Sequence, residues 1–203
     1  MPAIGITGGI STGKSTFCDC LRASLPNAKF FDADKAAHQL VDLVEVREAI
    51  RREFGSEVFS TAGDLNRAAL RAIIFRDAAK KRALEQIFHP RIRREWRAEA
   101  EKHRNLPDFF FADIPLLYET GGEILCDRVV LVACSAGMQL QRLRERAGIA
   151  HEVAKQMIAA QMPLADKIKR ADHVVWNDAP EHMLREQSKL LVDLWRTETW
   201  MKA

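Results

Sequence analysis

The feature that most constrains the fold of this chain is a glycine-rich motif directly after an apolar N-terminal run. Residues 8–15 read Gly-Gly-Ile-Ser-Thr-Gly-Lys-Ser and fit Gly-x-x-x-x-Gly-Lys-[Ser/Thr], and they follow the sequence Ala-Ile-Gly-Ile of residues 3–6. Glycines let a backbone curl so that successive N–H groups point at a polyphosphate, and the following helix adds its positive N-terminus. A strand-to-helix corner would explain the glycines, but not Lys14 and Ser15. The sequence therefore predicts a phosphate-binding loop between a strand and a helix.

Each residue type in this loop has a task in a nucleotide site. The lysine of such a loop reaches the β- and γ-phosphates, and the serine that follows it holds Mg²⁺ through its hydroxyl. We therefore expect Lys14 to be catalytic and Ser15 to be a metal ligand. The residues expected to bind the nucleotide are Gly8, Gly9, Ser11, Thr12, Gly13, Lys14, Ser15 and Thr16.

Length and charge favour a single soluble domain spanning residues 1–203. The 31 Lys and Arg residues nearly balance the 28 Asp and Glu residues, and the net charge of +3 does not suggest nucleic-acid binding. No apolar run approaches the length of a membrane span, and no cationic leader precedes the first strand. The four cysteines fit neither a disulfide framework nor a metal-binding spacing. We expect a cytoplasmic protein without nucleic-acid or membrane partners.

Short apolar runs alternate with helical patterns along the chain, which favours an α/β fold with a parallel sheet covered on both faces. The expected strands are residues 3–7, 28–32, 109–114, 128–133 and 173–176. The stretch between Gly63 and Asn105 is almost wholly helical, too long for a simple crossover, and indicates a helical insertion. The final helix is expected to bury one stripe made of Met183, Leu184, Leu190, Leu191, Leu194 and Trp195.

Three aspartates lie at the ends of predicted strands, at the edge where open α/β sheets bind ligands. Alternation along an extended segment would send Asp32 and Asp34 to the same side. One carboxylate could then orient the water shell of a metal, and the other could accept the proton of an attacking hydroxyl. Either one could instead simply cap the next helix. Asp113, at the end of a third apolar strand, is expected either near Mg²⁺ or as a loop cap.

Two arginines and one histidine are further candidates for the functional site. Arg142 and Arg146 lie four residues apart on one helix face, where they could close over a nucleotide and neutralise the transferred phosphoryl group. A solvated helix face is the alternative. His89-Pro90 is expected to end one helix and start the next, with His89 in a structural turn or facing the acceptor.

Several segments in a fixed order resemble the signatures of the dephospho-coenzyme A kinases, a family of small-molecule kinases with a phosphate-binding loop (P-loop). The first four are Ile6-Thr7-Gly8-Gly9-Ile10-Ser11-Thr12-Gly13-Lys14-Ser15-Thr16, Asp32-Ala33-Asp34, Leu65-Asn66-Arg67 and His89-Pro90. The others are Ile114-Pro115-Leu116-Leu117-Tyr118-Glu119, Gln139-Leu140-Gln141-Arg142, Gln161 and Ala171-Asp172-His173-Val174-Val175-Trp176-Asn177. The resemblance spans nearly the whole chain.

The resemblance implies a P-loop nucleoside-triphosphate hydrolase-like three-layer sandwich with a five-stranded parallel sheet. A helical acceptor-side insertion at about residues 55–106 and a lid at about residues 140–166 are implied with it. The family transfers the γ-phosphate of ATP to the ribose 3′-hydroxyl of dephospho-CoA, which is the last step of coenzyme A synthesis. ATP and dephospho-CoA are thus the implied substrates and Mg²⁺ the implied cofactor.

The resemblance also implies roles for single residues. Asp34 is the candidate base, Asp32 lies beside it near Mg²⁺, Arg142 and Arg146 belong to the lid, and Asn177 lies near the adenine. The residues implied to border the acceptor, besides Asp34, are Arg67, His89, Pro115, Leu116 and Glu119.

Two departures from the family pattern stand out. Ser11 replaces a glycine of many members, so the turn loses some conformational freedom. Met162-Pro163-Leu164 stands where an arginine often follows Gln161. We expect Lys167 or Lys169 to supply that lid cation, or the cation to be absent.

Two other functions compete with this interpretation. Another small-molecule kinase of the same fold would differ in the helical block and lid, whereas a nucleotide-sensing adaptor would bind ATP without chemistry. The adaptor is disfavoured because a sensor has no need for a base. A GTPase is disfavoured because the chain lacks an Asn-Lys-x-Asp motif.

Overall fold

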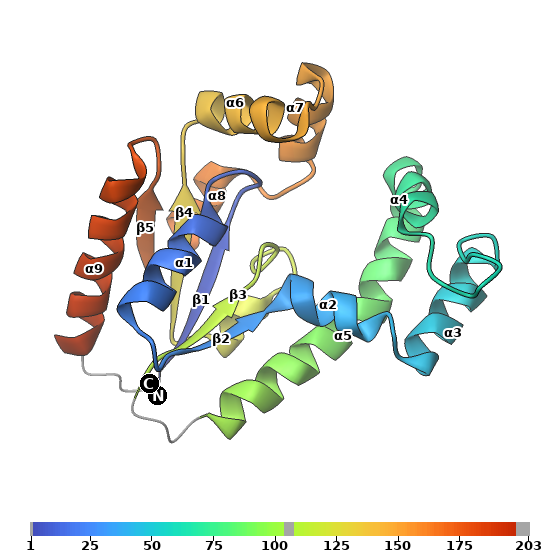
Figure 1. The fold of residues 1–203 in the computed structure, drawn as a ribbon, viewed down its shortest axis with the longest axis horizontal. Coiled ribbons are helices and arrows are strands. Elements are labelled where there is room, and N and C mark those ends of the chain that lie inside the picture. Colours follow the sequence, from blue (N-terminus) through green and yellow to red (C-terminus); the bar gives the residue numbers. More distant parts are fainter. Residues whose placement is uncertain (1, 104–107, 198–203) are drawn as a thin grey trace. The chain divides into compact units, whose positions relative to one another are not determined.

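The chain folds into two compact units, which Figure 1 shows in a computed structural model. The structure describes residues 2–103 and 108–197, with the side chains of all of these except residues 146 and 147. One unit, the sheet unit, is formed by Met1–Phe31 and Ala100–Ala203. The other, the helical unit, is formed by Asp32–Glu99.

The sheet unit is built on five parallel strands in the order β2-β3-β1-β4-β5. The strands are β1 (Ala3–Gly8), β2 (Lys29–Asp32), β3 (Phe110–Asp113), β4 (Arg128–Ala133) and β5 (His173–Trp176). The central strand β1 pairs with β3 from Ala3 opposite Phe110 and with β4 from Ile4 opposite Arg128. The expected five-stranded parallel sheet is confirmed, and β4 and β5 have the bounds that the sequence predicts.

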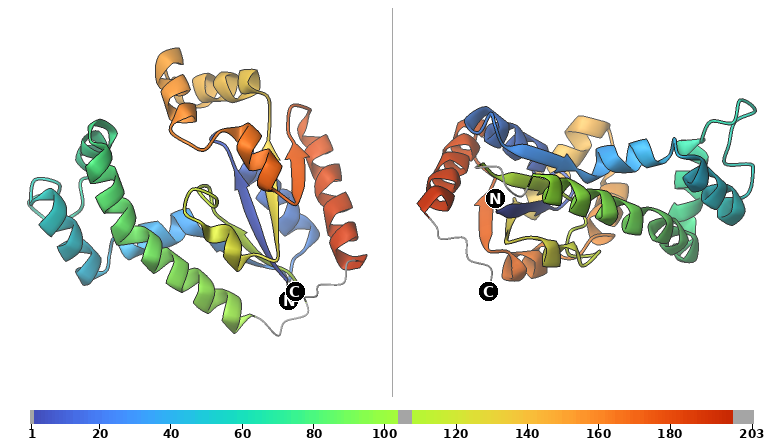
Figure 2. Two further views of the ribbon diagram at one scale, coloured as in Figure 1. Left: turned by 180° about the vertical axis from the view of Figure 1, so that it is seen from behind. Right: turned by 90° about the horizontal axis from the view of Figure 1, so that it is seen from below.

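Helices cover both faces of this sheet, as expected. On one face, α1 (Lys14–Ser24) and α9 (Glu181–Thr197) lie side by side (Figure 1). Their buried side chains, such as Phe17 and Trp195, join Ile4, Phe111 and Val132 of the sheet in one core. On the opposite face lie α8 (Leu164–Arg170) and the short 3₁₀-helix η1 (Gly122–Leu125), as Figure 2 shows. The helices α6 (Ala136–Ala147) and α7 (His151–Ala159) lie beyond the carboxyl ends of the strands.

The apolar stripe expected on the final helix is wrong in part. The buried residues of α9 are Leu184, Ser188, Val192 and Trp195. Met183, Leu190 and Leu194 are instead 44%, 69% and 43% exposed. Because a helix advances 100° per residue, the spacing 184, 188, 192 and 195 defines one face, and the three exposed residues point well away from it.

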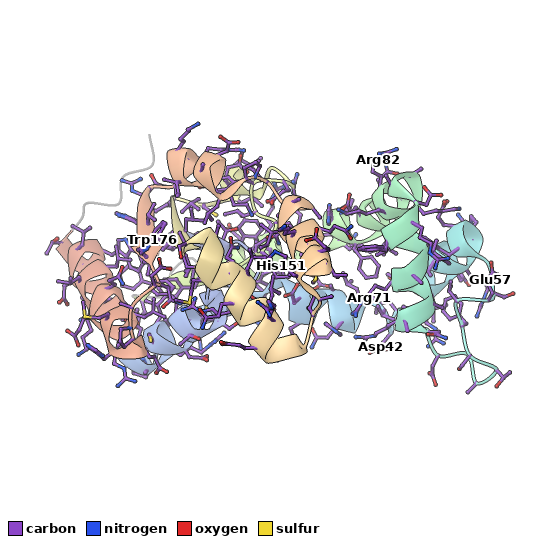
Figure 3. The ribbon with its side chains drawn as sticks, turned by 90° about the horizontal axis from the view of Figure 1, so that it is seen from above. Asp42, Glu57, Arg71, Arg82, His151 and Trp176 are labelled. Atoms are coloured by element: carbon purple, nitrogen blue, oxygen red, sulfur yellow. The ribbon has the colours of Figure 1, made fainter. Side chains whose placement is uncertain are left out.

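The outer strand β5 pairs with β4 and is also bonded to a side chain of α9. The side-chain amide of Gln187 accepts from the main-chain N–H of Trp176 at 3.0 Å and donates to the carbonyl of the same residue at 2.9 Å. Trp176 itself is 45% exposed, and Figure 3 labels it at this edge of the unit.

The helical unit contains α2 (Ala33–Leu40), α3 (Val44–Phe54), α4 (Arg67–Arg76) and most of α5 (Ala78–Lys102). Its own core is made of Leu40, Val46, Ile50, Phe54, Val58 and Leu70. None of the helices in residues 2–103 and 108–197 is long and apolar enough to cross a membrane.

The helix break expected at His89-Pro90 is wrong, because α5 runs through Pro90 without ending. A proline inside a helix removes one main-chain hydrogen bond and crowds the preceding turn. Here the side chain of Arg91 donates to the carbonyl of Ile87 at 2.6 Å and so binds an oxygen of that turn. Phe88 and Ile92, on either side of the proline, also pack on the core of the helical unit, which favours a continuous helix.

Candidate active site

The glycine-rich segment forms a tight loop between β1 and α1. Gly13 has φ 94° and Ser11 has φ 58°, so both adopt the left-handed region that favours glycine. Inside the loop, the side chain of the buried Thr12 donates to the carbonyl of Gly9 at 2.9 Å. Ser11 thus occupies, with a side chain, a conformation for which glycine is the natural choice.

Arg142 and Asn177 hold the second half of the loop. The guanidinium of Arg142 donates to the carbonyl of Thr12 at 3.3 Å and to that of Asn177 at 2.8 Å. The side-chain amide of Asn177 donates to the same Thr12 carbonyl at 2.8 Å. The structure therefore brings together, at the loop, an arginine expected in the lid and an asparagine expected near the adenine.

Two glutamines hold the first half of the loop at a single residue. The main-chain N–H of Ile10 donates to the side chain of Gln161 at 2.7 Å, and its carbonyl accepts from the side chain of Gln139 at 2.8 Å. In the sequence these glutamines stand out only through the family resemblance. Their contacts link positions 151 and 129 residues apart, so no local pattern could have revealed them.

Lys14 forms an ion pair with Asp113, the last residue of β3. The side chains are only 14% and 10% exposed. The other carboxylate oxygen of Asp113 accepts from the thiol of Cys18 at 3.5 Å. Burial, and next the charge of Asp113, raise the pKa of this thiol. The two partners of Asp113, Lys14 and Cys18, both belong to the first turns of α1 after the loop, so Asp113 lies near the phosphate site.

Lys167, one of the two lysines expected to supply a lid cation, is completely buried. Its ammonium pairs with Glu119 at 2.8 Å and lies 3.4 Å from the carbonyls of Gly8 and Pro115. The expectation of a lid cation at Lys167 is therefore wrong, because Glu119 neutralises this ammonium inside the protein. Lys169 is 76% exposed and pairs with Asp166 at 3.2 Å.

The segment after β3 is tied to the residues that follow α7. Glu119 accepts from the main-chain N–H of Met162 at 3.0 Å in addition to its pair with Lys167. The carbonyl of Leu116 accepts from the hydroxyl of Thr120 at 2.8 Å, which closes a turn. Three residues implied to border the acceptor, Pro115, Leu116 and Glu119, thus lie in a segment bonded to the base of the phosphate loop.

The helical unit carries the remaining acceptor-side candidates together with Asp32, the aspartate expected near Mg²⁺. Asp32 caps α2 by accepting from the N–H of Lys35 at 2.9 Å, which agrees with the helix-cap prediction for this residue. The expected alternation of Asp32 and Asp34 is wrong, because α2 begins at Ala33 and Asp34 is an exposed residue of its first turn. Arg67 is the exposed first residue of α4.

His89 lies half-buried in the middle of α5. Its burial lowers its pKa below the ordinary value of 6.5, and this outweighs the opposite effect of Glu85. The neighbouring charge of Arg93 lowers the pKa further.

Ser15 is exposed in the first turn of α1, and Thr16 follows it half-buried. The main chain of Arg146 belongs to α6, but its side chain lies outside the described part of the molecule. No group of three His, Cys, Asp or Glu side chains that could hold a metal ion occurs within residues 2–103 and 108–197.

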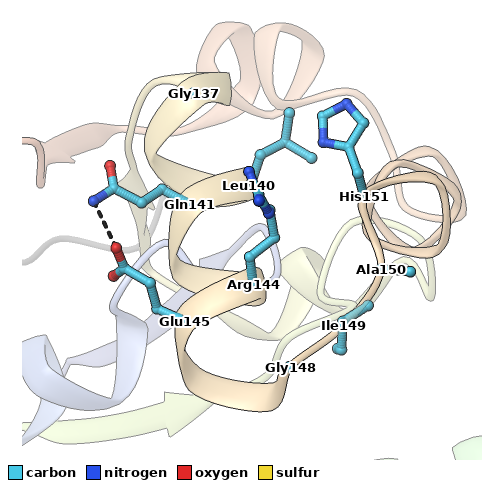
Figure 4. Close-up of a pocket in the computed structure, with 9 residues that line it drawn as sticks. All are labelled: Gly137, Leu140, Gln141, Arg144, Glu145, Gly148, Ile149, Ala150 and His151. Carbon is cyan, nitrogen blue, oxygen red and sulfur yellow. Dashed lines mark hydrogen bonds between the residues drawn. The ribbon is translucent and has the colours of Figure 1, made fainter.

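A groove of about 830 Å³ opens between α6 and α7. Figure 4 shows Leu140, Arg144 and His151 along it, with the amide of Gln141 bonded to Glu145 at 2.9 Å. The groove residues of α6 recur at helical spacing on a face that differs from the one carrying Gln139 and Arg142. One face of α6 therefore holds the phosphate loop, and another lines the groove.

Comparisons with known proteins agree on one family. A family model described as dephospho-CoA kinase matches residues 2–182. The dephospho-CoA kinase of Anaeromyxobacter dehalogenans (strain 2CP-C) is 42% identical over 198 residues, covering 96% of this chain and 92% of its own. That of Geobacillus kaustophilus (strain HTA426) is 38% identical over 195 residues, covering 95% and 96%.

Solved structures give the same result for the fold. Dephospho-CoA kinase from Campylobacter jejuni superposes with a TM-score of 0.70 at 26% identity, over 94% of this chain and 95% of its own. Shikimate kinase from Aquifex aeolicus vf5, at 15% identity, has a TM-score of 0.53 over 96% of this chain and 98% of its own, and supports the P-loop kinase fold alone. Sequence, fold and loop geometry lead to one conclusion: the chain belongs to the dephospho-CoA kinase family, the kinases that catalyse the final step of coenzyme A biosynthesis.

Proposed function

We propose that this chain transfers the γ-phosphate of ATP to the ribose 3′-hydroxyl of dephospho-CoA, giving coenzyme A and ADP. The observation that carries the proposal is the phosphate loop, with Lys14 at its end and side chains of α6, α8 and the β5 end bonded to its main chain. A loop held in this way is ready to surround a polyphosphate with N–H groups before the nucleotide binds.

Lys14 supports the proposal through its present partner. In the described structure its ammonium pairs with Asp113, which holds the lysine at the end of the loop. In the proposed reaction Lys14 moves to the β- and γ-phosphates, where it stabilises charge on the transferred group. Arg142, bonded to the loop carbonyl of Thr12, adds positive charge from α6, and we assign Arg146 to the lid on the family pattern.

The residues present fit Mg²⁺, which P-loop kinases usually use with ATP. Mg²⁺ prefers oxygen ligands and keeps several waters when it binds together with phosphates. We propose the hydroxyl of Ser15 as a direct ligand and Asp32 as a carboxylate near it, with Asp113 as a further oxygen donor near Lys14. When bound, the ion would neutralise charge on the β- and γ-phosphates.

Asp34 is the proposed base for the acceptor hydroxyl. An uncharged hydroxyl is a weak nucleophile, so most of the rate should come from alignment and charge stabilisation, with the carboxylate accepting the proton as the bond forms. We assign Arg67, His89, Pro115, Leu116 and Glu119 to the acceptor side and Asn177 to the adenine side.

The proposal extends to organisation and location. The helical insertion at about residues 55–106 would carry acceptor contacts, and the lid at about residues 140–166 would exclude water, because an open site would waste ATP by hydrolysis. We propose a cytoplasmic enzyme whose partners are its two small-molecule substrates.

The first test is ADP formation with Mg²⁺-ATP and a panel of acceptors: dephospho-CoA, AMP, adenosine, shikimate and none. The proposal requires turnover with dephospho-CoA and a 3′-phosphate on the product by NMR. Turnover with another acceptor alone would keep the kinase and reject the substrate. ATP binding without transfer to any acceptor would favour the adaptor instead.

The second test concerns Asp34. Asp34→Asn should lower kcat by about 10² to 10⁴, the usual worth of general base catalysis, while ATP binding stays near normal. Asp42→Asn is the matched control, since Asp42 is another exposed aspartate of the helical unit (Figure 3). Near-normal turnover of Asp34→Asn would remove this residue from the base role.

A further inference from the structure

At Ile10 both ends of the α6–α7 segment are bonded to the phosphate loop. Gln139 lies in the first turns of α6 and is 3% exposed, and its amide nitrogen donates to the Ile10 carbonyl at 2.8 Å. Gln161 follows α7, and its amide oxygen accepts from the Ile10 N–H at 2.7 Å. Both main-chain polar groups of Ile10 are therefore bound by side chains.

This arrangement fixes the orientation of the peptide between Ile10 and Ser11. A trans peptide is planar, and its carbonyl and N–H point in opposite directions. Because Gln139 binds the carbonyl of Ile10, the N–H of Ser11 is directed to the opposite side of the same peptide. In a phosphate loop such N–H groups are the ligands of the nucleotide.

The backbone of Ser11 adopts an unfavourable conformation that neighbouring hydrogen bonds must stabilise. Its φ of 58° is the only positive φ of a non-glycine residue in the described parts of the chain. A Cβ makes this conformation unfavourable, so the neighbouring structure must impose it. Gly9 leaves the space required, since a Cβ there would lie 2.6 Å from the amide nitrogen of Gln139.

We propose that Gln139 and Gln161 are positioning residues that hold the peptides on either side of Ile10 in their nucleotide-binding orientation before ATP arrives, Gln139 the Ile10–Ser11 peptide and Gln161 the Gly9–Ile10 peptide. The two glutamines act through the main chain of Ile10. The proposal rests on the proposed use of ATP at this loop, and it adds that ATP affinity depends on two side chains of the α6–α7 segment. Gln139 must donate and Gln161 must accept.

The same substitution at the two positions tests this. Gln139→Glu loses the donor and places a carboxylate against the Ile10 carbonyl, so the Kd for Mg²⁺-ATP measured by calorimetry without acceptor should rise at least tenfold. Gln161→Glu keeps an acceptor for the Ile10 N–H, so its Kd should stay within about threefold of the parent value. Gln156→Glu, at an exposed position of α7, controls for added negative charge.

Two further variants complete the comparison. Gln139→Met removes the donor without adding charge, and it should weaken ATP binding. It also serves as the test of this position if Gln139→Glu does not fold. Gln161→Leu removes the acceptor and should weaken it as well. In all these variants the KM for dephospho-CoA should change less than that for ATP. Equal effects of Gln139→Glu and Gln161→Glu, or an unchanged ATP Kd in Gln139→Met, would overturn the proposal.

A double-variant cycle with Ser11 separates positioning from general destabilisation. Glycine adopts the left-handed region without support, so Ser11→Gly in the Gln139→Met background should recover at least threefold in ATP affinity relative to Gln139→Met alone. Effects that simply multiply would contradict the positioning role. ATP binding is measured without acceptor, so a failure of phosphoryl transfer to dephospho-CoA would count against the proposed function and leave this result intact.

Discussion

The ammonium of Lys14 and the carboxylate of Asp113 are paired across 99 residues of sequence. This contact joins the end of the phosphate loop to the end of the neighbouring strand β3. The lysine expected to bind phosphate is thus already held near its site by a carboxylate. When ATP binds, its phosphates must replace Asp113 as the partner of the Lys14 ammonium. This replacement connects nucleotide binding to the position of Asp113.

The first prediction concerns the stability of this pair without nucleotide. Lys14→Met and Asp113→Asn should each lower the free energy of unfolding by about 2–4 kcal/mol, because each leaves a mostly buried partner uncompensated. The double variant should lose less than the sum, with a coupling of at least about 1 kcal/mol. Urea denaturation of the four proteins measures it, and strictly additive losses would show that the pair contributes nothing.

The second prediction concerns Arg142. Arg142→Lys keeps the charge but cannot reach the carbonyls of Thr12 and Asn177 with a planar fork, so ATP affinity should fall by about 10- to 100-fold. Arg144→Lys is the control, because Arg144 lies on another face of α6 and lines the groove. Comparable affinities for the two variants would assign Arg142 to the solvated face considered from the sequence.

The third prediction concerns the buried ammonium of Lys167. Lys167→Met should lower the free energy of unfolding by about 3–5 kcal/mol, because Glu119 loses its buried partner. Lys169→Met, on the same helix but 76% exposed, should change it by less than about 0.5 kcal/mol. Adding Glu119→Gln to Lys167→Met should recover part of the loss. Similar stabilities of the two lysine variants would contradict the buried ion pair.

The fourth prediction concerns pH. Burial lowers the pKa of His89 in the folded protein, so below its ordinary value of 6.5 the unfolded chain takes up this proton more readily. Stability should therefore decline as the pH falls from about 7.5 to 5.5, and His89→Gln should lose less of its Tm over that range. The exposed His182, changed to Gln, is the control. An identical pH dependence of all three proteins would rule out a contribution from His89.

The sequence was most informative where a single local pattern determines structure. Strands β4 and β5 are continuous short runs dominated by apolar residues, and their predicted bounds agree with the structure. The phosphate loop is equally local, since the glycine spacing and the flanking strand and helix lie within a few residues. The family match adds the function.

Three errors arose where the sequence is compatible with two local alternatives. Pro90 stays inside α5, where the residues on either side of it have core contacts. Asp34 is helical and not extended, because Asp32 caps α2 and the helix begins at Ala33, inside the segment that the alternation treated as extended. α9 carries apolar residues on two faces, and only the face with Leu184 and Trp195 packs on the sheet.

The contacts around the phosphate loop could not be predicted for another reason. Gln139, Gln161 and Lys167 act through bonds to main-chain atoms far away in sequence, and hydrogen bonds to a carbonyl or N–H leave no trace in the partner's residue type. A buried lysine is especially hard to foresee, because only the fold reveals the carboxylate and carbonyls that surround it.

The amide of Gln187 has a consequence for how copies of this enzyme behave in a crowded solution. An outer strand normally offers its N–H and C=O groups to any extended chain that approaches, which makes it a starting point for intermolecular β-pairing. Gln187 occupies both groups of Trp176, so a visiting strand would have to displace a side chain before it could add to the sheet there. Gln187 thereby opposes aggregation through β-pairing at the exposed Trp176.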